Sequence, residues 1–247
     1  MSRDLHLCRI NLNMPALYRL AKERRLPPFT EDDGYTAHST LREAFGECAP
    51  LPFSMRPVRG AYLPVLGYSN EPADALLSCL SERRSDFPLA CGAVSQTSME
   101  SKQMPGNWRQ GTVLDFEVKI CPVVRKARGA QNKKPGAEID VFLDALPNDG
   151  STLEQSREDV YSMWLRERFL QAGVADLVTA KMTGFRLATL VRRSSNRKAH
   201  TTRRPEAIFC GKLCVNDGPG FSEWVRRGIG RHRAFGFGML LLRPAGR

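Results

Sequence analysis

The sequence predicts an α+β protein made of two tandem ferredoxin-like units, each with the order strand, helix, strand, strand, helix, strand. Three observations support this fold class. The chain has 247 residues, 42% of them hydrophobic, which is enough for two cores. Short alternating segments and amphipathic segments follow one another in both halves, and the chain closes on a glycine-rich turn and a short apolar strand. We expect an N-terminal unit at 1–126, a basic linker or loop at 127–155 and a C-terminal unit at 156–247.

The N-terminal half supplies the elements of the first unit. In chain order we expect a strand at 5–12, a helix at 35–46, two short strands within 54–69, a helix at 71–84 and a long strand at 113–124. The first strand follows from alternating apolar residues, and Gly46 is typical of a helix end. The helix at 71–84 gathers its apolar residues on one face, and the strand at 113–124 alternates. Residues 14–34 are expected to be irregular, and residues 85–107 carry no clear pattern.

The C-terminal half repeats the order in part. We expect an amphipathic helix at 156–173, strands at 177–191 and 206–216, a short helix at 219–227 and a final strand after residue 238. No close internal sequence repeat relates the halves, so a duplication would be structural only.

Two basic segments interrupt this pattern. In the segment 192–204, six of thirteen residues are basic: Arg192, Arg193, Arg197, Lys198, Arg203 and Arg204. A basic hairpin tip suits binding along a duplex backbone, although a solvated loop would have the same composition. The segment 125–137 begins with Arg125 and Lys126, and it is either a second basic contact or a solvated connector.

The turn from Gly228 to Gly238 is the most informative segment of the chain. Glycine permits positive φ, successive N–H groups in such a turn form an anion-binding nest, and arginine adds phosphate donors. The spacing fits neither a dinucleotide-binding loop nor a nucleotide P-loop, and a ligand-free glycine hairpin remains the alternative. The candidate anion-binding residues of this turn are Gly228, Gly230, Arg231, His232, Arg233, Gly236 and Gly238.

Composition limits the partners. The net charge is +11, from 37 Lys and Arg against 26 Asp and Glu, which favours a polyanion. No apolar run reaches 18 residues, and the N-terminus lacks the apolar core of a secretion signal. The seven cysteines are scattered without a C-x-x-C pair. We therefore expect a cytoplasmic protein with reduced cysteines, no metal site and no cofactor.

Three segments resemble one family. Phe209 to Phe221 and Gly228 to Leu242 are similar to the C-terminus of CasE-type CRISPR endoribonucleases, which belong to the RAMP superfamily. Residues 113–125 and the helix motif Tyr35-Thr-Ala-His38 are similar to two further segments of that family. The resemblance implies two RAMP-type, RRM-like ferredoxin folds. It also implies binding of a CRISPR repeat stem-loop, metal-independent cleavage at its 3′ base, and transfer of the bound guide RNA to other Cas proteins.

The resemblance and the chemistry together select the candidate catalytic residues. Metal-free RNA cleavage needs a group that removes a proton from the 2′-hydroxyl, and histidine suits this step. Of the four histidines, His38 fits the family motif, and Tyr35 lies on the same helical face. His232 is a second candidate, while His6 and His200 are expected to be incidental.

Several alternatives stay open at this point. An arginine-based site would first involve Arg24, Arg25 and Arg42, which also count among the expected RNA contacts. The chain could instead be a non-cleaving RNA-binding subunit of a CRISPR ribonucleoprotein, or an unrelated basic RNA-binding protein such as an assembly factor. The sequence leaves the CRISPR type undecided, with I-E and IV both compatible.

Overall fold

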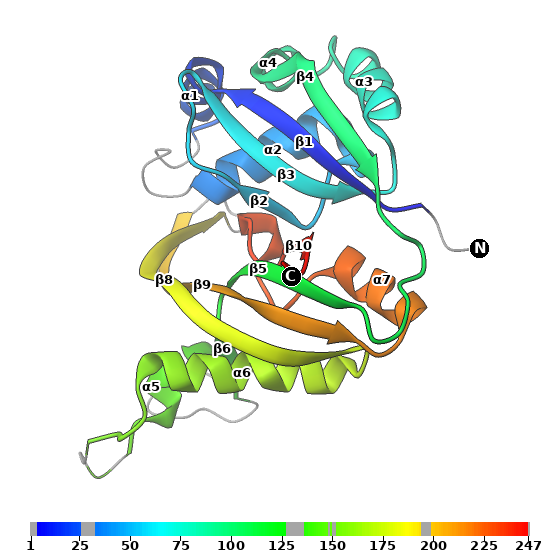
Figure 1. Cartoon of the computed structure of the whole chain (residues 1–247). Helices are drawn as coiled ribbons and strands as arrows, with labels where there is room; N and C mark the ends of the chain where they lie inside the picture. Colours follow the sequence, from blue (N-terminus) through cyan, green and yellow to red (C-terminus); the bar gives the residue numbers. More distant parts are fainter. Residues whose placement is uncertain are drawn as a thin grey trace.

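Two four-stranded antiparallel sheets, each with its own helices, lie one above the other in Figure 1. The computed structural model describes residues 4–25, 33–126, 136–147, 149, 152–193 and 199–246. In both sheets the strand order, counted along the chain within each unit, is fourth, first, third, second. This is the strand order of a ferredoxin-like unit, so the predicted α+β class with two such units is confirmed.

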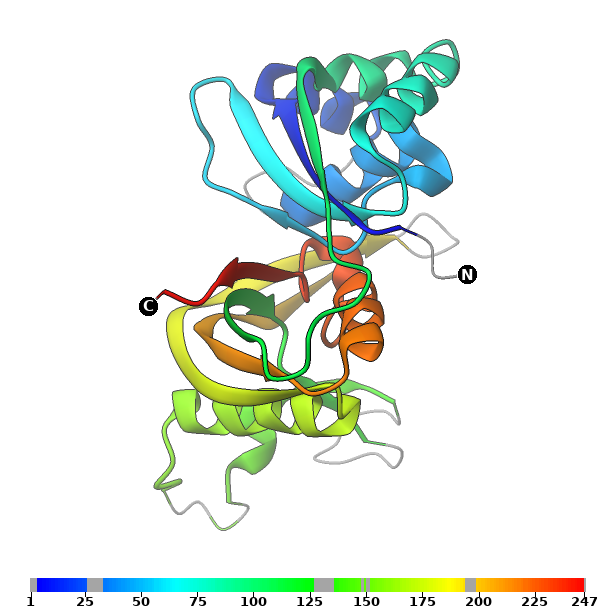
Figure 2. The same ribbon diagram turned by 45° about the vertical axis from the view of Figure 1, so that its right-hand side comes forward.

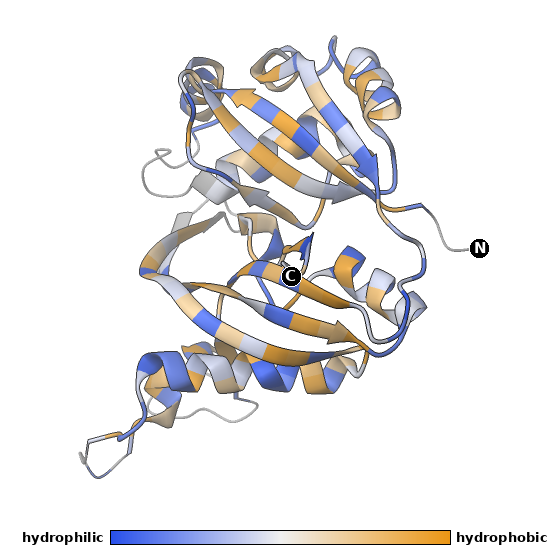
Figure 3. Cartoon of the chain, viewed as in Figure 1, coloured by the Kyte–Doolittle hydropathy of each residue, from blue (hydrophilic) through white to orange (hydrophobic). Residues whose placement is uncertain are grey.

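The first unit holds the sheet β2-β3-β1-β4. Its strands are β1 (His6–Asn13), β2 (Phe53–Met55), β3 (Tyr62–Ser69) and β4 (Val94–Gln103). Its helices are α1 (Met14–Glu23), α2 (Asp33–Phe45), α3 (Ala73–Glu82) and α4 (Pro88–Ala93), with a 3₁₀ turn η1 (Gly46–Cys48) after α2. Alternate residues of β1 (Cys8, Ile10 and Leu12) enter the core of this unit, where they meet Ala37 and Leu41 of α2. Figure 3 shows this alternation as bands along β1.

The second unit holds the sheet β10-β5-β9-β8. Its strands are β5 (Val113–Ile120), β8 (Ala175–Arg193), β9 (Ala199–Val215) and β10 (Leu240–Pro244), with helices α6 (Arg157–Ala172) and α7 (Gly218–Arg227). A capping box between Ser156 and Asp159 starts α6, and Gly173 ends it at φ 68°. Between β5 and α6 lie β6 (Val123–Arg125), β7 (Glu138–Asp140) and α5 (Val141–Ala145). The turn before β10 contains a 3₁₀ helix, η2 (Arg233–Phe235).

Two predictions about the first unit were wrong. Strand β5 pairs with β9 and β10 in the second sheet, and β4 takes the place we had expected it to fill. Strand β4 lies at a sheet edge and exposes most of its polar residues, so it has little apolar alternation. Residues 14–23 form helix α1, because the Asn13 side chain caps it and Leu17, Leu20 and Ala21 are buried.

A further prediction was wrong in part of the expected linker at 127–155. Strand β7 and helix α5 lie inside that range, and β7 pairs with β6. The Asp140 side chain caps α5 by accepting from the backbone N–H of Phe142. Residues 127–135 lie outside the part of the chain that the structure describes. The helices predicted at 35–46, 71–84, 156–173 and 219–227 correspond to α2, α3, α6 and α7.

The two units share one packed interface. The Tyr68 hydroxyl of β3 donates a 2.8 Å hydrogen bond to the Leu240 carbonyl of β10. Leu5 and Tyr68 both belong to the apolar core of the second unit. Figure 2 follows the chain from β4 down to β5, the connection between the units. Within the described residues, no helix is long and apolar enough to cross a membrane.

Candidate functional site

Helix α2 packs directly on the glycine turn, although the two are about 200 positions apart in the sequence. A methyl group built on Gly34 would lie 2.4 Å from the Phe235 carbonyl oxygen, so only glycine allows this approach. The Tyr35 ring lies next to the Phe235 ring, with centroids 5.9 Å apart. The sequence motif Tyr35-x-x-His38 and the C-terminal turn therefore meet at one place in the fold.

His38 lies one turn further along α2 and is half-buried. Its imidazole stacks parallel to the Phe53 ring of β2, with centroids 6.4 Å apart and an interplanar angle of 1°. Burial lowers the pKa of His38 below its usual 6.5, and the charge of Arg42 lowers this pKa further. At neutral pH the imidazole is therefore mainly uncharged, the form that can accept a proton.

The three arginines of the alternative site lie around the same helix. Arg42 pairs with Glu47 at 2.6 Å, and Arg24 pairs with Glu43 of α2 at 3.4 Å. Arg25 follows α1 at a positive φ of 50°. Arg24, Arg25 and Arg42 are all exposed, and the charge of Arg42 acts on His38.

The glycines of the terminal turn adopt the backbone conformation that the sequence predicted for them. Gly228, Gly230, Gly236 and Gly238 have φ values of 74°, 74°, 79° and 80°. His232, between them, also has a positive φ of 62°, which is uncommon for a residue with a Cβ. The backbone of the turn is thus strongly curved. A hydrogen bond from the Ile229 N–H to the Gly238 carbonyl joins its two ends.

A basic pocket of about 400 Å³ opens beside this turn. Gly228 to Arg231 and Arg233 of the turn line it together with residues of helices α6 and α7. Among the described residues, its lining includes Arg168, Arg227, Arg231 and Arg233 and no acidic side chain. Arg168 and Arg227 had not been singled out from the sequence, because each lies on an amphipathic helix where a basic residue is ordinary.

The His232 side chain is buried, whereas the sequence predicts a loop histidine that can reach RNA. This side chain is only 2% exposed, and its Nε2 lies 2.9 Å from Glu138 Oε2. The Glu138 carboxylate is 5% exposed and also contacts Arg125, Arg204 and Arg231. The hydrogen bond from His232 is the largest cause that lowers the pKa of Glu138, and with the charges of His232, Arg204 and Arg231 it brings this pKa to about 2. No sequence pattern marks Glu138, because its partners lie as far as 94 positions away.

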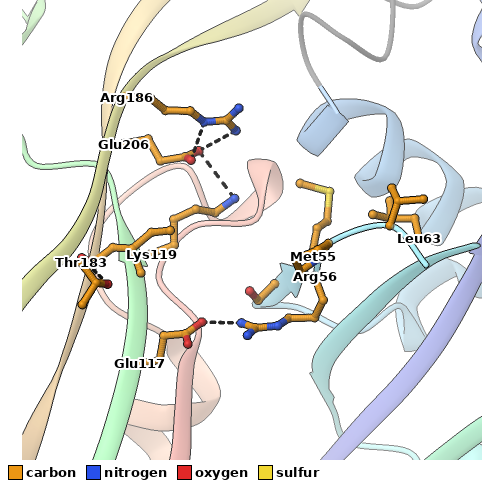
Figure 4. Close-up of a pocket in the computed structure, with 12 residues that line it drawn as sticks. Met55, Arg56, Leu63, Glu117, Lys119, Thr183, Arg186 and Glu206 are labelled. Atoms are coloured by element: carbon orange, nitrogen blue, oxygen red, sulfur yellow. Dashed lines mark hydrogen bonds and ion pairs between the residues drawn. The ribbon is translucent and has the colours of Figure 1, made fainter. Parts of the chain in front are cut away.

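A second, charged groove lies between the two units (Figure 4). Arg56, directly after β2, pairs with Glu117 of β5 across it, and the Glu206 carboxylate holds Lys119 at 3.7 Å and Arg186 at 2.6 Å. Each carboxylate in this groove thus has a basic partner. The described lining of this groove carries both charges, whereas the charged residues described in the lining of the pocket beside the glycine turn are arginines.

The remaining predicted RNA contacts are distributed along the second unit. Lys126 pairs with Asp144 at 2.9 Å, and Arg203 is exposed on β9. Arg192 and Arg193 end strand β8, which pairs with β9 to form the long hairpin. Arg197 and Lys198 lie outside the described residues. Among the described residues, no three His, Cys, Asp or Glu side chains gather as metal ligands.

The chain is similar to known proteins in both sequence and fold. The sequence model of a family described as "CRISPR associated protein" matches residues 5–244. A structure of the CRISPR endoribonuclease Cse3 bound to a 19-nucleotide RNA is 21% identical, with a TM-score of 0.64 over 97% of this chain and 100% of that one. Thermus thermophilus Cse3, bound to an RNA that represents a pre-cleavage complex, is 20% identical, with a TM-score of 0.61 over 98% and 100%.

A subunit of a CRISPR RNA-guided surveillance complex is 14% identical, with a TM-score of 0.54 over 96% of this chain and 100% of that one. At these identities the likeness establishes the fold. A search of curated protein sequences gave no match.

Proposed function

The chain belongs to the family of CRISPR-associated proteins, and we propose that it is an endoribonuclease that processes CRISPR repeat RNA. In this proposal it binds the stem-loop of the repeat transcript in the cytoplasm and cuts at the 3′ base of the stem without a metal ion. One observation gives this proposal its main support. The motif helix with Tyr35 and His38 and the glycine turn, which resembled that family separately in sequence, are in contact in the fold.

The proposed reaction follows from the state of His38. The uncharged imidazole accepts the proton of the 2′-hydroxyl, and the 2′-oxygen then attacks the adjacent phosphorus. The bond from phosphorus to the 5′-oxygen breaks, and that oxygen takes up a proton from the solvent. The products are a 2′,3′-cyclic phosphate and a 5′-hydroxyl. General acid–base help of this kind contributes about 10²–10⁴ in rate.

The other groups act on position and charge. The Tyr35 hydroxyl, on the same face of α2, can hold the 2′-hydroxyl by a hydrogen bond. Arg231 and Arg233 of the glycine turn supply positive charge where negative charge grows on the phosphorane. The basic hairpin β8–β9 and Arg203 would bind the backbone of the stem.

The test is cleavage of a repeat hairpin in the presence of EDTA. The substrate carries the repeat sequence of the host's own CRISPR array, and a second copy has a 2′-deoxy nucleotide at the scissile position. We expect the wild-type protein to cut only the first copy. His38→Ala should lower the single-turnover rate at least 100-fold and keep binding within a few-fold, and Tyr35→Phe should lower the rate less.

His6→Ala is the matched control, because His6 starts strand β1 and lies opposite Ser69 and Gln103 in the first sheet. Full cutting by His38→Ala would reject the assignment of His38 and direct attention to Arg24, Arg25 and Arg42. An intact hairpin that stays tightly bound to the wild-type protein would instead favour the non-cleaving subunit. The similar fold of a surveillance-complex subunit supports the expectation that cut RNA stays bound and joins other Cas proteins.

A further inference from the structure

One buried carboxylate joins four basic groups from three separate parts of the second unit. Glu138 begins strand β7 and is 5% exposed. Its Oε1 lies 2.9 Å from Arg231 Nε and 3.7 Å from Arg125, while its Oε2 lies 2.9 Å from His232 Nε2 and 3.3 Å from Arg204 Nε. The partners come from β6, from β9 and from the glycine turn.

We propose that Glu138 is a positioning residue that assembles Arg125, Arg204 and Arg231 into one cluster for a backbone phosphate of the RNA. We infer further that its bond to His232 fixes the glycine turn against the helix that carries His38. This inference rests on the proposed function, since it names a phosphate contact of the same RNA substrate.

The stoichiometry of the cluster supports a phosphate ligand. A carboxylate has two oxygens with about four acceptor positions, and the four basic groups share them. Each guanidinium has five N–H donors, so one contact with Glu138 leaves most of them free to bind another anion. Three arginines against one carboxylate leave an excess of positive charge. Arg231 and Arg125 are 46% and 51% exposed, so their outer donors face solvent where an RNA strand can approach.

The buried side of the cluster leads to the catalytic helix. His232 holds a positive φ of 62°, a strained conformation for a residue with a Cβ that persists only when its surroundings support it. That support comes from Glu138 on one side and from edge-on packing against Phe235 on the other, with ring centroids 6.0 Å apart. Phe235 in turn contacts Tyr35 of α2. A continuous series of contacts therefore runs from Glu138 through His232 and Phe235 to Tyr35.

The charge state of the carboxylate agrees with this role. Its pKa of about 2 keeps Glu138 ionised at every pH at which the protein would meet RNA. The carboxylate is therefore a permanent negative centre beneath the arginines. It holds the three guanidinium groups near one point although they would otherwise repel one another.

The decisive experiment compares Glu138→Gln with Glu100→Gln. Both substitutions remove one negative charge, but Glu100 lies on β4, and its carboxylate is 71% exposed next to Arg9. Binding is measured with the 2′-deoxy repeat hairpin at several salt concentrations, and cleavage is measured with the all-ribose hairpin under single turnover. Both proteins are first compared with the wild type by thermal unfolding, so that a loss of fold is recognised.

We expect Glu100→Gln to bind as tightly as the wild type or slightly more tightly. Glu138→Gln should bind about tenfold more weakly in spite of its greater positive charge. Its slope of log Kd against log salt should also fall by about one, the loss of one phosphate contact. The cleavage rate at saturating protein should fall as well, because the turn is no longer fixed against α2. Equal affinity, salt slope and cleavage rate in the two variants would overturn the inference.

A second pair of substitutions tests the shared phosphate when Glu138→Gln unfolds. Arg125→Gln and Arg231→Gln are compared singly and together with the same 2′-deoxy hairpin. If both arginines bind the same phosphate, the effects of the two substitutions on affinity are coupled. The double variant should then lose less binding free energy than the sum of the two single losses. Strict additivity would reject the single cluster. A wild-type protein that binds the hairpin with this coupling but never cuts it would refute the proposed nuclease and leave the cluster supported.

Discussion

Gly34 and Phe235 are in backbone contact, and this contact joins the first unit to the glycine turn of the second. A Cβ at position 34 would lie 2.4 Å from the Phe235 carbonyl oxygen and 2.8 Å from its carbon. Both are backbone atoms that cannot rotate away. The distance between helix α2 and the turn therefore depends on the absence of a side chain at position 34.

Gly34→Ala should consequently separate α2 from the glycine turn. We expect a loss of stability of about 1–3 kcal/mol from overpacking, and a fall in the cleavage rate of about 100-fold from a displacement of about 1 Å at the site. Chemical denaturation and single-turnover cleavage measure the two effects. Gly92→Ala in α4 is the control, since nothing lies within 4 Å of a Cβ there. A fully active Gly34→Ala protein would show that this approach is not needed for catalysis.

The pH dependence of cleavage should report the lowered pKa of His38. As a general base the imidazole must be uncharged, so the rate should rise with pH through the pKa of His38 and become constant above it. Burial and Arg42 lower that pKa, so the midpoint should lie below 6.5. Arg42→Gln should move the midpoint upward, because the repulsion by the neighbouring charge is removed. A midpoint at or above 6.5 in the wild-type protein would contradict this role for His38.

The fold class followed from the sequence because the buried strands alternate and the helices are amphipathic. Strand β4 gave no such signal, since it has polar residues on both faces, and this gap led us to place β5 in the wrong unit. The C-terminal pattern itself lacked a first strand, which β5 supplies. Helix α1 was missed because its basic residues and the Pro27-Pro28 pair suggested irregular structure, whereas its apolar residues Leu17 and Leu20 are buried.

The candidate site was predictable only where a motif is local. Tyr35 and His38 are three positions apart, and the glycine turn is continuous, so both could be read from the sequence. Their contact and the Phe53 stack depend on tertiary packing. The role of Glu138 could not be predicted, because it also depends on tertiary packing. An isolated acidic residue after a basic segment has no sequence pattern that indicates a buried ion-pair centre.

Glu138 should contribute to stability at neutral pH and lose that contribution in acid. Its pKa in the folded protein is about 2, below the ordinary 4.5. Its stabilising effect is therefore complete above pH 4.5 and decreases as the pH falls towards 2. The groups that face it are His232, Arg125, Arg204 and Arg231.

Urea unfolding of the wild type and of Glu138→Gln between pH 3 and 7 can isolate this effect. The other carboxylates with lowered pKa values are present in both proteins, so their contributions cancel in the difference. Glu138→Gln should be less stable than the wild type at pH 7, and the difference should shrink as the pH falls. A difference that stays constant across this range would mean that the charge of Glu138 does not stabilise the fold.

The hydrogen bond between Tyr68 and Leu240 should contribute to the stability of the joined units. The Tyr68 side chain is almost fully buried, its hydroxyl donates to the Leu240 carbonyl at 2.8 Å, and burial raises its pKa. Tyr68→Phe leaves that carbonyl without this donor, so we expect a loss of about 1–3 kcal/mol in the free energy of unfolding. Tyr62→Phe is the matched control on the same strand, because Tyr62 is 41% exposed. Urea denaturation of both variants decides the matter, and equal midpoints would assign the contact between β3 and β10 to apolar packing alone.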